Sequence, residues 1–160
     1  MSCLLTSCSK EVTAPPKSDE MQHMERAARL VLQTLVKSNS AVTPANLQEL
    51  KQLIKSKLKP DDLKEMGIDD VDKALTSTRD NQSYVLVPGV NIRNSMGPKE
   101  AHGGRTSSPT GSAGLSYSGP PIIMYEQKGS GGKHMVAYAR SGAAELDDDK
   151  LREHVPSYKP

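Results

Sequence analysis

Residues 18–77 read SDEMQHMERAARLVLQTLVKSNSAVTPANLQELKQLIKSKLKPDDLKEMGIDDVDKALTS, and apolar residues recur in this stretch at spacings of three and four. Such spacing places them on one face of a helix. The first predicted helix begins after the N-cap Ser18 and ends near Lys37. Asp19 and Glu20 place negative charge in its first turn, where the helix dipole favours it. Its apolar stripe contains Met21, Met24, Ala28, Val31 and Leu35, widened by Ala27, Leu32 and Val36.

Three shorter helical pieces follow in the same stretch. The second predicted helix begins at Thr43-Pro44 and ends before Lys59-Pro60, because the residue before proline is pushed out of the helical region. Residues 61–66 predict a single turn that ends at Gly67, and Asp69 is expected to cap a last helix with Val71, Ala74 and Leu75 facing inward. Short connections between the pieces predict a compact helical bundle over residues 18–77.

The second half of the chain changes character after Ser77. Residues 84–87 predict a short strand, and residues 122–126 and 134–138 predict a β-hairpin whose turn is rich in glycine. Residues 143–155 are expected to form a final short helix. The predicted fold class is α+β, mainly α: a small N-terminal helical bundle, a short strand, a Gly/Ser/Pro-rich flexible segment and a C-terminal hairpin. The corresponding units are a tail (1–17), bundle (18–77), strand region (78–93), flexible segment (94–121), hairpin with helix (122–155) and tail (156–160).

Composition limits the size of the core. The chain has 160 residues, no Phe or Trp and only five Tyr, and its hydrophobic fraction is 35%. Globular domains usually reach about 45–50%, counted with glycine. A core without large aromatic side chains buries less apolar area per residue, so we expect a small core and a partly unstructured chain. The net charge of +2 at pH 7 is too small to require a nucleic acid partner.

The N-terminal segment and the hydropathy of the chain bear on where in the cell the protein is expected. Cys3 and Cys8 are the only cysteines, and a pair this close without a nearby His cannot complete a zinc site. Reduced thiols in the cytoplasm or nucleus are therefore expected, with acylation of one Cys as the alternative. No run approaches the roughly 20 apolar residues that cross a bilayer, so no membrane span is predicted.

One tract resembles a known family. Residues 62–68, read as DLKEMGI, resemble the short-helix signature of sterile alpha motif domains, which are five-helix interaction modules. The resemblance covers this tract alone, and the long C-terminal helix of such domains has no counterpart before Thr78. We therefore do not assign the chain to this family.

No motif predicts catalysis, a metal site or a cofactor. Gly131-Gly132-Lys133 is similar to the end of a phosphate-binding loop, but the glycine and hydroxyl positions of that loop hold Gln127 and His134. Residues 147–149 are three aspartates without the glycine and distal glutamate of a calcium loop. The four histidines lack metal-ligand spacing: His23, His102, His134 and His154. We expect a protein that is not an enzyme.

Two functions remain open at this point. The first is a protein–protein interaction module or small regulatory subunit that binds another protein or itself through the second helix, at Leu47, Leu50, Ile54 and Leu58. The alternative is a nucleic-acid-binding protein of winged-helix type, because a winged helix consists of three helices followed by a β-hairpin, and the sequence predicts both. Its phosphate contacts would come from Lys51, Lys55, Lys57 and Lys59.

Overall fold

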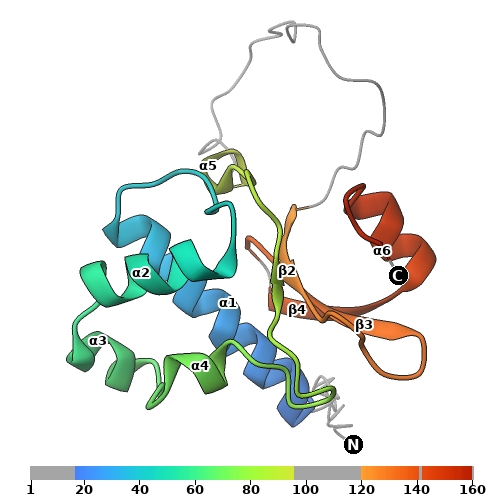
Figure 1. Ribbon diagram of the computed structural model, residues 1–160, viewed down its shortest axis with the longest axis horizontal. Coiled ribbons are helices and arrows are strands. Elements are labelled where there is room, and N and C mark those ends of the chain that lie inside the picture. The colour runs from blue at the N-terminus through green and yellow to red at the C-terminus, as the bar shows by residue number, and fades with distance from the viewer. Residues whose placement is uncertain (1–16, 96–119, 141, 160) are drawn as a thin grey trace, which may run out of the picture.

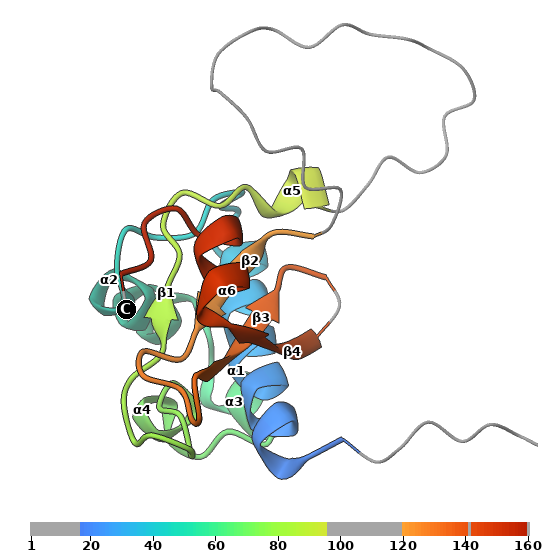
Figure 2. The same ribbon diagram turned by 90° about the vertical axis from the view of Figure 1, so that its right-hand side faces the viewer.

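A computed structural model of the chain describes residues 17–95, 120–140 and 142–159. These residues contain an antiparallel sheet whose four strands lie side by side in chain order: β1 (Val85–Leu86), β2 (Ile122–Tyr125), β3 (Lys133–Tyr138) and β4 (Gly142–Asp147). One face of the sheet contacts helix α1 (Asp19–Lys37), and the other contacts helix α6 (Asp148–His154). Figure 2 shows α6 in front of the sheet and α1 behind it. The fold is therefore α+β, with the helices of residues 47–74 gathered beside α1 (Figure 1).

Helix α1 begins where the sequence predicts. The Oγ of Ser18, its N-cap, accepts the backbone N–H of Met21 at 3.2 Å. Most of the predicted apolar stripe is buried, and Met24, Val31 and Leu35 are completely enclosed. Val36, which the stripe includes at its margin, is instead 59% exposed. Helix α1 thus supplies the centre of the core and keeps one apolar side chain at the surface.

Helix α2 (Leu47–Lys57) begins later than predicted. Asn46 is its N-cap, and the side chain accepts the N–H of Glu49 at 2.9 Å. Thr43, the predicted cap, bonds elsewhere: its hydroxyl donates to the carbonyl of Val87 at 2.6 Å and accepts the N–H of Val90 at 2.9 Å. The predicted start was wrong because a distant segment satisfies the side chain that would otherwise cap a helix.

Two short helices complete this layer. Helix α3 (Pro60–Glu65) ends before Gly67, whose φ of 68° lies in the left-handed region, as the prediction of a terminating glycine requires. Helix α4 (Val71–Ala74) is capped by Asp70 and not by the predicted Asp69.

The predicted hairpin is confirmed. Strands β2 and β3 are antiparallel, with Tyr125 opposite Val136. Gly129 in the turn between them has a φ of 65°, and a Cβ at this position would collide with the backbone of Lys133. The glycine is therefore a requirement of the turn.

The predicted helix over residues 143–155 is partly wrong. Residues 142–147 form β4, which pairs along its length with β3, and Ala144 lies opposite Val136. Helix α6 begins only at Asp148, after the N-cap Asp147. Ala, Glu and Leu are good helix formers, so local preference in this segment favours a helix. Pairing with β3 is a tertiary interaction that overrides this preference.

The sheet divides the apolar core into two clusters. The larger cluster joins α1, α2 and α4 to strand residues such as Ile123, Met124 and Met135. The smaller lies under α6 and the C-terminal residues: Ile122, Tyr125, Val136, Leu151, Val155 and Tyr158. The N-terminal helices thus share their core with the sheet.

Other predicted segments fall at the margins of the structure. Only two residues of the region 78–93 form a regular strand, β1, and the alternation at 90–92 leads into helix α5 (Ile92–Ser95). The predicted tail 1–17, with Cys3 and Cys8, and the predicted flexible segment 94–121 lie almost entirely outside the described residues. Within the described part of the chain, no helix has both the length and the hydropathy needed to cross a membrane.

Candidate functional site

The four leucine and isoleucine residues predicted to bind a partner lie on the inner side of α2. Leu50, Ile54 and Leu58 are at most 7% exposed and belong to the larger cluster, and Leu47 packs against it. These side chains hold α2 on α1 in the structure, so a partner would reach them only by displacing the helix.

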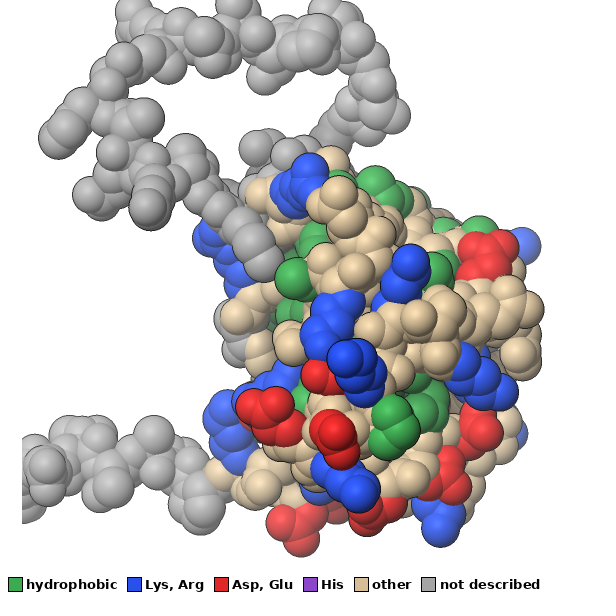
Figure 3. All heavy atoms as spheres, turned by 90° about the vertical axis from the view of Figure 1, so that its left-hand side faces the viewer, with side chains coloured by type: hydrophobic (Ala, Val, Ile, Leu, Met, Phe, Trp, Pro, Cys, Tyr) green, Lys and Arg blue, Asp and Glu red, His purple; other side chains and the backbone are tan. Residues whose placement is uncertain are grey.

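The four predicted phosphate-binding lysines are placed differently from one another. Lys51 forms an ion pair with Asp72, with Nζ and Oδ1 2.5 Å apart, whereas Lys55, Lys57 and Lys59 are exposed. Figure 3 shows acidic and basic side chains intermingled on the side of the molecule that carries α2 and α3. Nucleic acid binding by these lysines remains a prediction.

A buried carboxylate joins four segments that are distant in the sequence. Glu126, 1% exposed, accepts the hydroxyl of Ser77 at 2.6 Å on Oε1 and the N–H of Met135 at 2.8 Å on Oε2. The guanidinium of Arg79 lies 3.6 Å from Oε2 of Glu126, and it lies 2.6 Å from Oε1 of Glu145. Of these contacts, those from Ser77 and Arg79 hold the loop after α4 on the sheet, and the one from Met135 joins the carboxylate to β3.

A second polar cluster fixes the C-terminal segment. Nδ1 of His134 donates to the carbonyl oxygen of Glu126 at 2.9 Å, and Nε2 lies 2.9 Å from Oδ1 of Asp148 and 3.0 Å from the hydroxyl of Tyr158. That hydroxyl donates to Asp148 at 2.5 Å. The hydrogen bonds from Tyr158 and His134 lower the pKa of Asp148, while burial and Asp148 itself raise the pKa of Tyr158 to about 12. Because both ring nitrogens already have partners, the cluster is suited to anchoring α6 and the residues after it.

The lowered pKa of Asp148 predicts a pH-dependent contribution to stability. Its ordinary value is about 3.9, so the stabilisation is present above about pH 4 and is lost as the pH falls through the lower, folded-state pKa. We expect the free energy of unfolding to fall less steeply below about pH 4 in Asp148→Asn than in the unmodified protein. Urea unfolding between about pH 2 and 7 measures this, with the exposed neighbour changed in Asp149→Asn as control. Equal acid slopes for the unmodified protein and Asp148→Asn would contradict the prediction.

A groove of about 520 Å³ lies between α1 and the end of the β3–β4 hairpin. We call it the α1 groove, and the lining residues that matter here are Lys17, Glu25, Arg29, Leu32, Val36 and Arg140. Lys17 and Glu25 form an ion pair of 2.6 Å at one end. The Glu25 carboxylate lies next to Gly142, whose φ of 92° is in the left-handed region that favours glycine. Arg29 and Arg140 have no ion pair with any residue that the structure describes.

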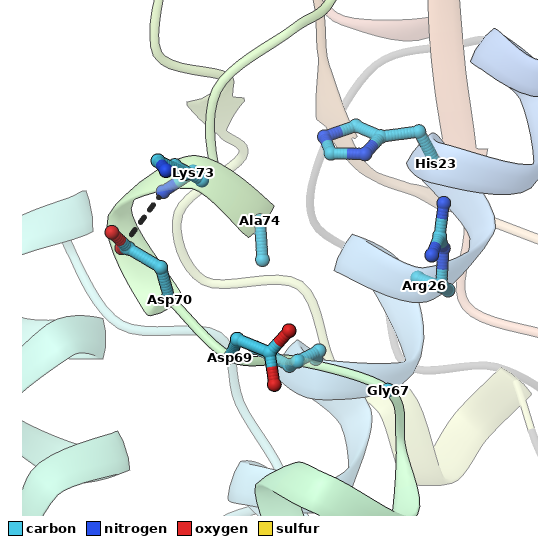
Figure 4. A pocket seen from close by; sticks show the side chains of 8 residues that line it. His23, Arg26, Gly67, Asp69, Asp70, Lys73 and Ala74 are labelled. Atoms are coloured by element: carbon cyan, nitrogen blue, oxygen red, sulfur yellow. Dashed lines mark hydrogen bonds between the residues drawn. The ribbon is translucent and has the colours of Figure 1, made fainter.

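A smaller cavity of about 220 Å³ lies between the first half of α1 and the segment that enters α4. We call it the His23 cavity. Its walls carry His23 and Arg26 from α1, and Asp69, Asp70 and Lys73 from the α4 segment (Figure 4). Opposite charges therefore face one space from two separate elements.

Sequence patterns alone identify neither the groove nor the cavity. Val36 is visible in the sequence as a marginal member of the α1 stripe, but Arg140 is brought to the groove only by the strand pairing.

Comparison with protein-family models, curated proteins and solved structures finds no match for this chain.

Proposed function

We propose that the protein is a protein-interaction module that holds an acidic, partly apolar segment of a partner protein in the α1 groove. The observation that carries the proposal is an exposed apolar strip on α1 bordered by arginines from two elements. The proposal places the binding surface on α1, because the apolar side chains of α2 are occupied in the core.

The charges of the groove favour an acidic partner. Lys17 and Glu25 neutralise each other, while Arg29 on α1 and Arg140 on the hairpin lack an ion pair among the described residues. A guanidinium recognises a carboxylate through two parallel hydrogen bonds. Two such groups on opposite walls can therefore orient a segment that carries carboxylates.

The apolar part of the groove favours a partner that also has an apolar side chain. Leu32 and Val36 are four residues apart on α1 and therefore adjacent on its surface. Full burial of one Val or Leu side chain contributes about 1.5–3 kcal/mol. Covering the exposed part of Val36 supplies a share of this energy, and the arginines supply orientation.

Peptides selected from a random library on the immobilised full chain serve as the probe. We expect enriched peptides to combine Asp or Glu with an apolar residue, and their affinity, measured by fluorescence anisotropy, to fall about tenfold or more in Val36→Asp and in Arg29→Glu. Val42→Asp is the matched control, because Val42 is 42% exposed and does not line the groove.

Two outcomes would overturn this proposal. Failure to enrich acidic peptides would do so, and so would enriched peptides that bind Val36→Asp as tightly as the unmodified chain. A second copy of the chain could occupy the groove instead of a partner protein, and size-exclusion chromatography with light scattering tests this. A dimer that Val36→Asp converts to a monomer would assign the groove to that second copy.

A further inference from the structure

A second binding site, independent of the α1 groove, is suggested by the unpaired charges of the His23 cavity. We propose that this cavity binds a small zwitterion of the size and charge pattern of a free α-amino acid. The proposal rests on three observations: opposite charges on its two walls, an open acceptor on His23, and its volume.

The first observation concerns charge. Asp70 is committed to capping α4, because its Oδ1 accepts the N–H groups of Asp72 at 2.8 Å and Lys73 at 3.1 Å. The second of these bonds is the dashed line in Figure 4. The side chains of Asp69 and Arg26, by contrast, take part in no hydrogen bond or ion pair with the described residues. One free carboxylate and one free guanidinium thus border the same cavity from the α4 segment and from α1.

The second observation concerns the imidazole of His23. Its Nε2 lies 2.9 Å from the carbonyl oxygen of Thr76 and must donate to it, since a carbonyl only accepts. In the neutral ring Nδ1 is then an acceptor, and it has no partner in the described part of the chain. Figure 4 shows the ring turned toward the space between Ala74 and Arg26. A ligand ammonium can therefore donate to Asp69 and to His23, while a ligand carboxylate accepts from Arg26 or Lys73.

The third observation concerns size and surroundings. Ile68 and Ala74 are at most 9% exposed and give the cavity an apolar side. A volume of about 220 Å³ corresponds to about seven water molecules at roughly 30 Å³ each, and it lies below the usual range for drug-sized ligands. The two aspartates would oppose a purely anionic ligand such as phosphate. A molecule with about ten non-hydrogen atoms and both charges fits this cavity best.

Titration of the full chain with free serine, aspartate, lysine and leucine tests the proposal. Ligand-observed NMR detects binding and isothermal titration calorimetry measures it, with acetate, methylammonium and phosphate as singly charged or anionic comparisons. We expect at least one amino acid to bind with a dissociation constant of about 1 mM or tighter, and more tightly than any comparison compound. Asp69→Asn and Arg26→Gln should each weaken binding about tenfold or more.

Matched variants separate this effect from a general loss of charge or stability. Arg152→Gln removes an exposed arginine on α6, outside the cavity, and Asp61→Asn removes an exposed aspartate on α3. Both should bind as the unmodified chain does, and thermal unfolding should show that all four variants are folded. Absence of binding by every amino acid overturns the proposal. So does binding that survives both Asp69→Asn and Arg26→Gln, or phosphate binding that is tighter and insensitive to Asp69→Asn.

Discussion

Replacing Glu126 by alanine is expected to lower the free energy of unfolding by about 3–5 kcal/mol. The side chain is 1% exposed and accepts hydrogen bonds from Ser77 and Met135, with Arg79 close by. Its removal leaves buried donors without an acceptor and takes the buried carboxylate away from a largely buried guanidinium, which keeps only Glu145 and the carbonyl of Ser130 as partners among the described residues. Each unsatisfied buried group costs about 1–3 kcal/mol, more where it is charged. Urea unfolding followed by circular dichroism measures the difference.

Glu145→Ala is the control for this prediction. Its side chain is 41% exposed and pairs with the same guanidinium, so it forms the solvent-facing half of the network. Surface ion pairs contribute about 0–1 kcal/mol, and we expect a loss of this size. Similar losses for Glu126→Ala and Glu145→Ala would show that the buried carboxylate is not the centre of the network.

Local sequence signals predict several individual features correctly, because each of them acts within a few residues. Ser18 caps the helix that follows it, and Gly67 adopts the left-handed conformation that ends α3. The turn glycine Gly129 likewise marks the hairpin. These features depend on backbone conformations and hydrogen bonds that a short segment decides by itself.

The errors occur where a distant partner decides the structure. Thr43 bonds to Val87, 44 residues away, and so it does not cap α2. The segment that forms β4 has the composition of a helix and becomes a strand through its pairing with β3. The sequence pattern measures local preference, and here tertiary interactions override it.

The polar networks and the binding surface could not be predicted from the sequence, again because residues distant in the chain come together only in the folded structure. The buried network joins Ser77 to Glu126 across 49 positions and Arg79 to Glu145 across 66. Charged residues at such separations give no periodic signal. The apolar stripe of α2 does give one, but a stripe facing the core and a stripe facing a partner have the same spacing. Only the packing of α2 against α1 distinguishes the two.

Leu50→Ala tests that distinction, and we expect it to lower the free energy of unfolding by about 2–5 kcal/mol. Leu50 is completely buried between α2 and the rest of the larger cluster. Truncation removes the transfer energy of its methyl groups and leaves a cavity that the neighbouring helices fill only in part. Chemical denaturation measures the loss. Binding of the selected peptides to the fraction that remains folded should be unchanged, because the α1 groove does not include this residue.

Leu47→Ala makes the same chemical change at the start of the same helix, where the side chain is only partly buried. We expect a loss of about 1 kcal/mol. The pair of variants separates the two possible roles of the α2 stripe. If the stripe belongs to the core, the loss in the free energy of unfolding grows with the burial of the truncated side chain; if the stripe binds a partner, the loss does not depend on burial. If Leu50→Ala and Leu47→Ala left stability nearly unchanged while both abolished binding, the stripe of α2 would face a partner. The binding surface would then be α2 and not the α1 groove.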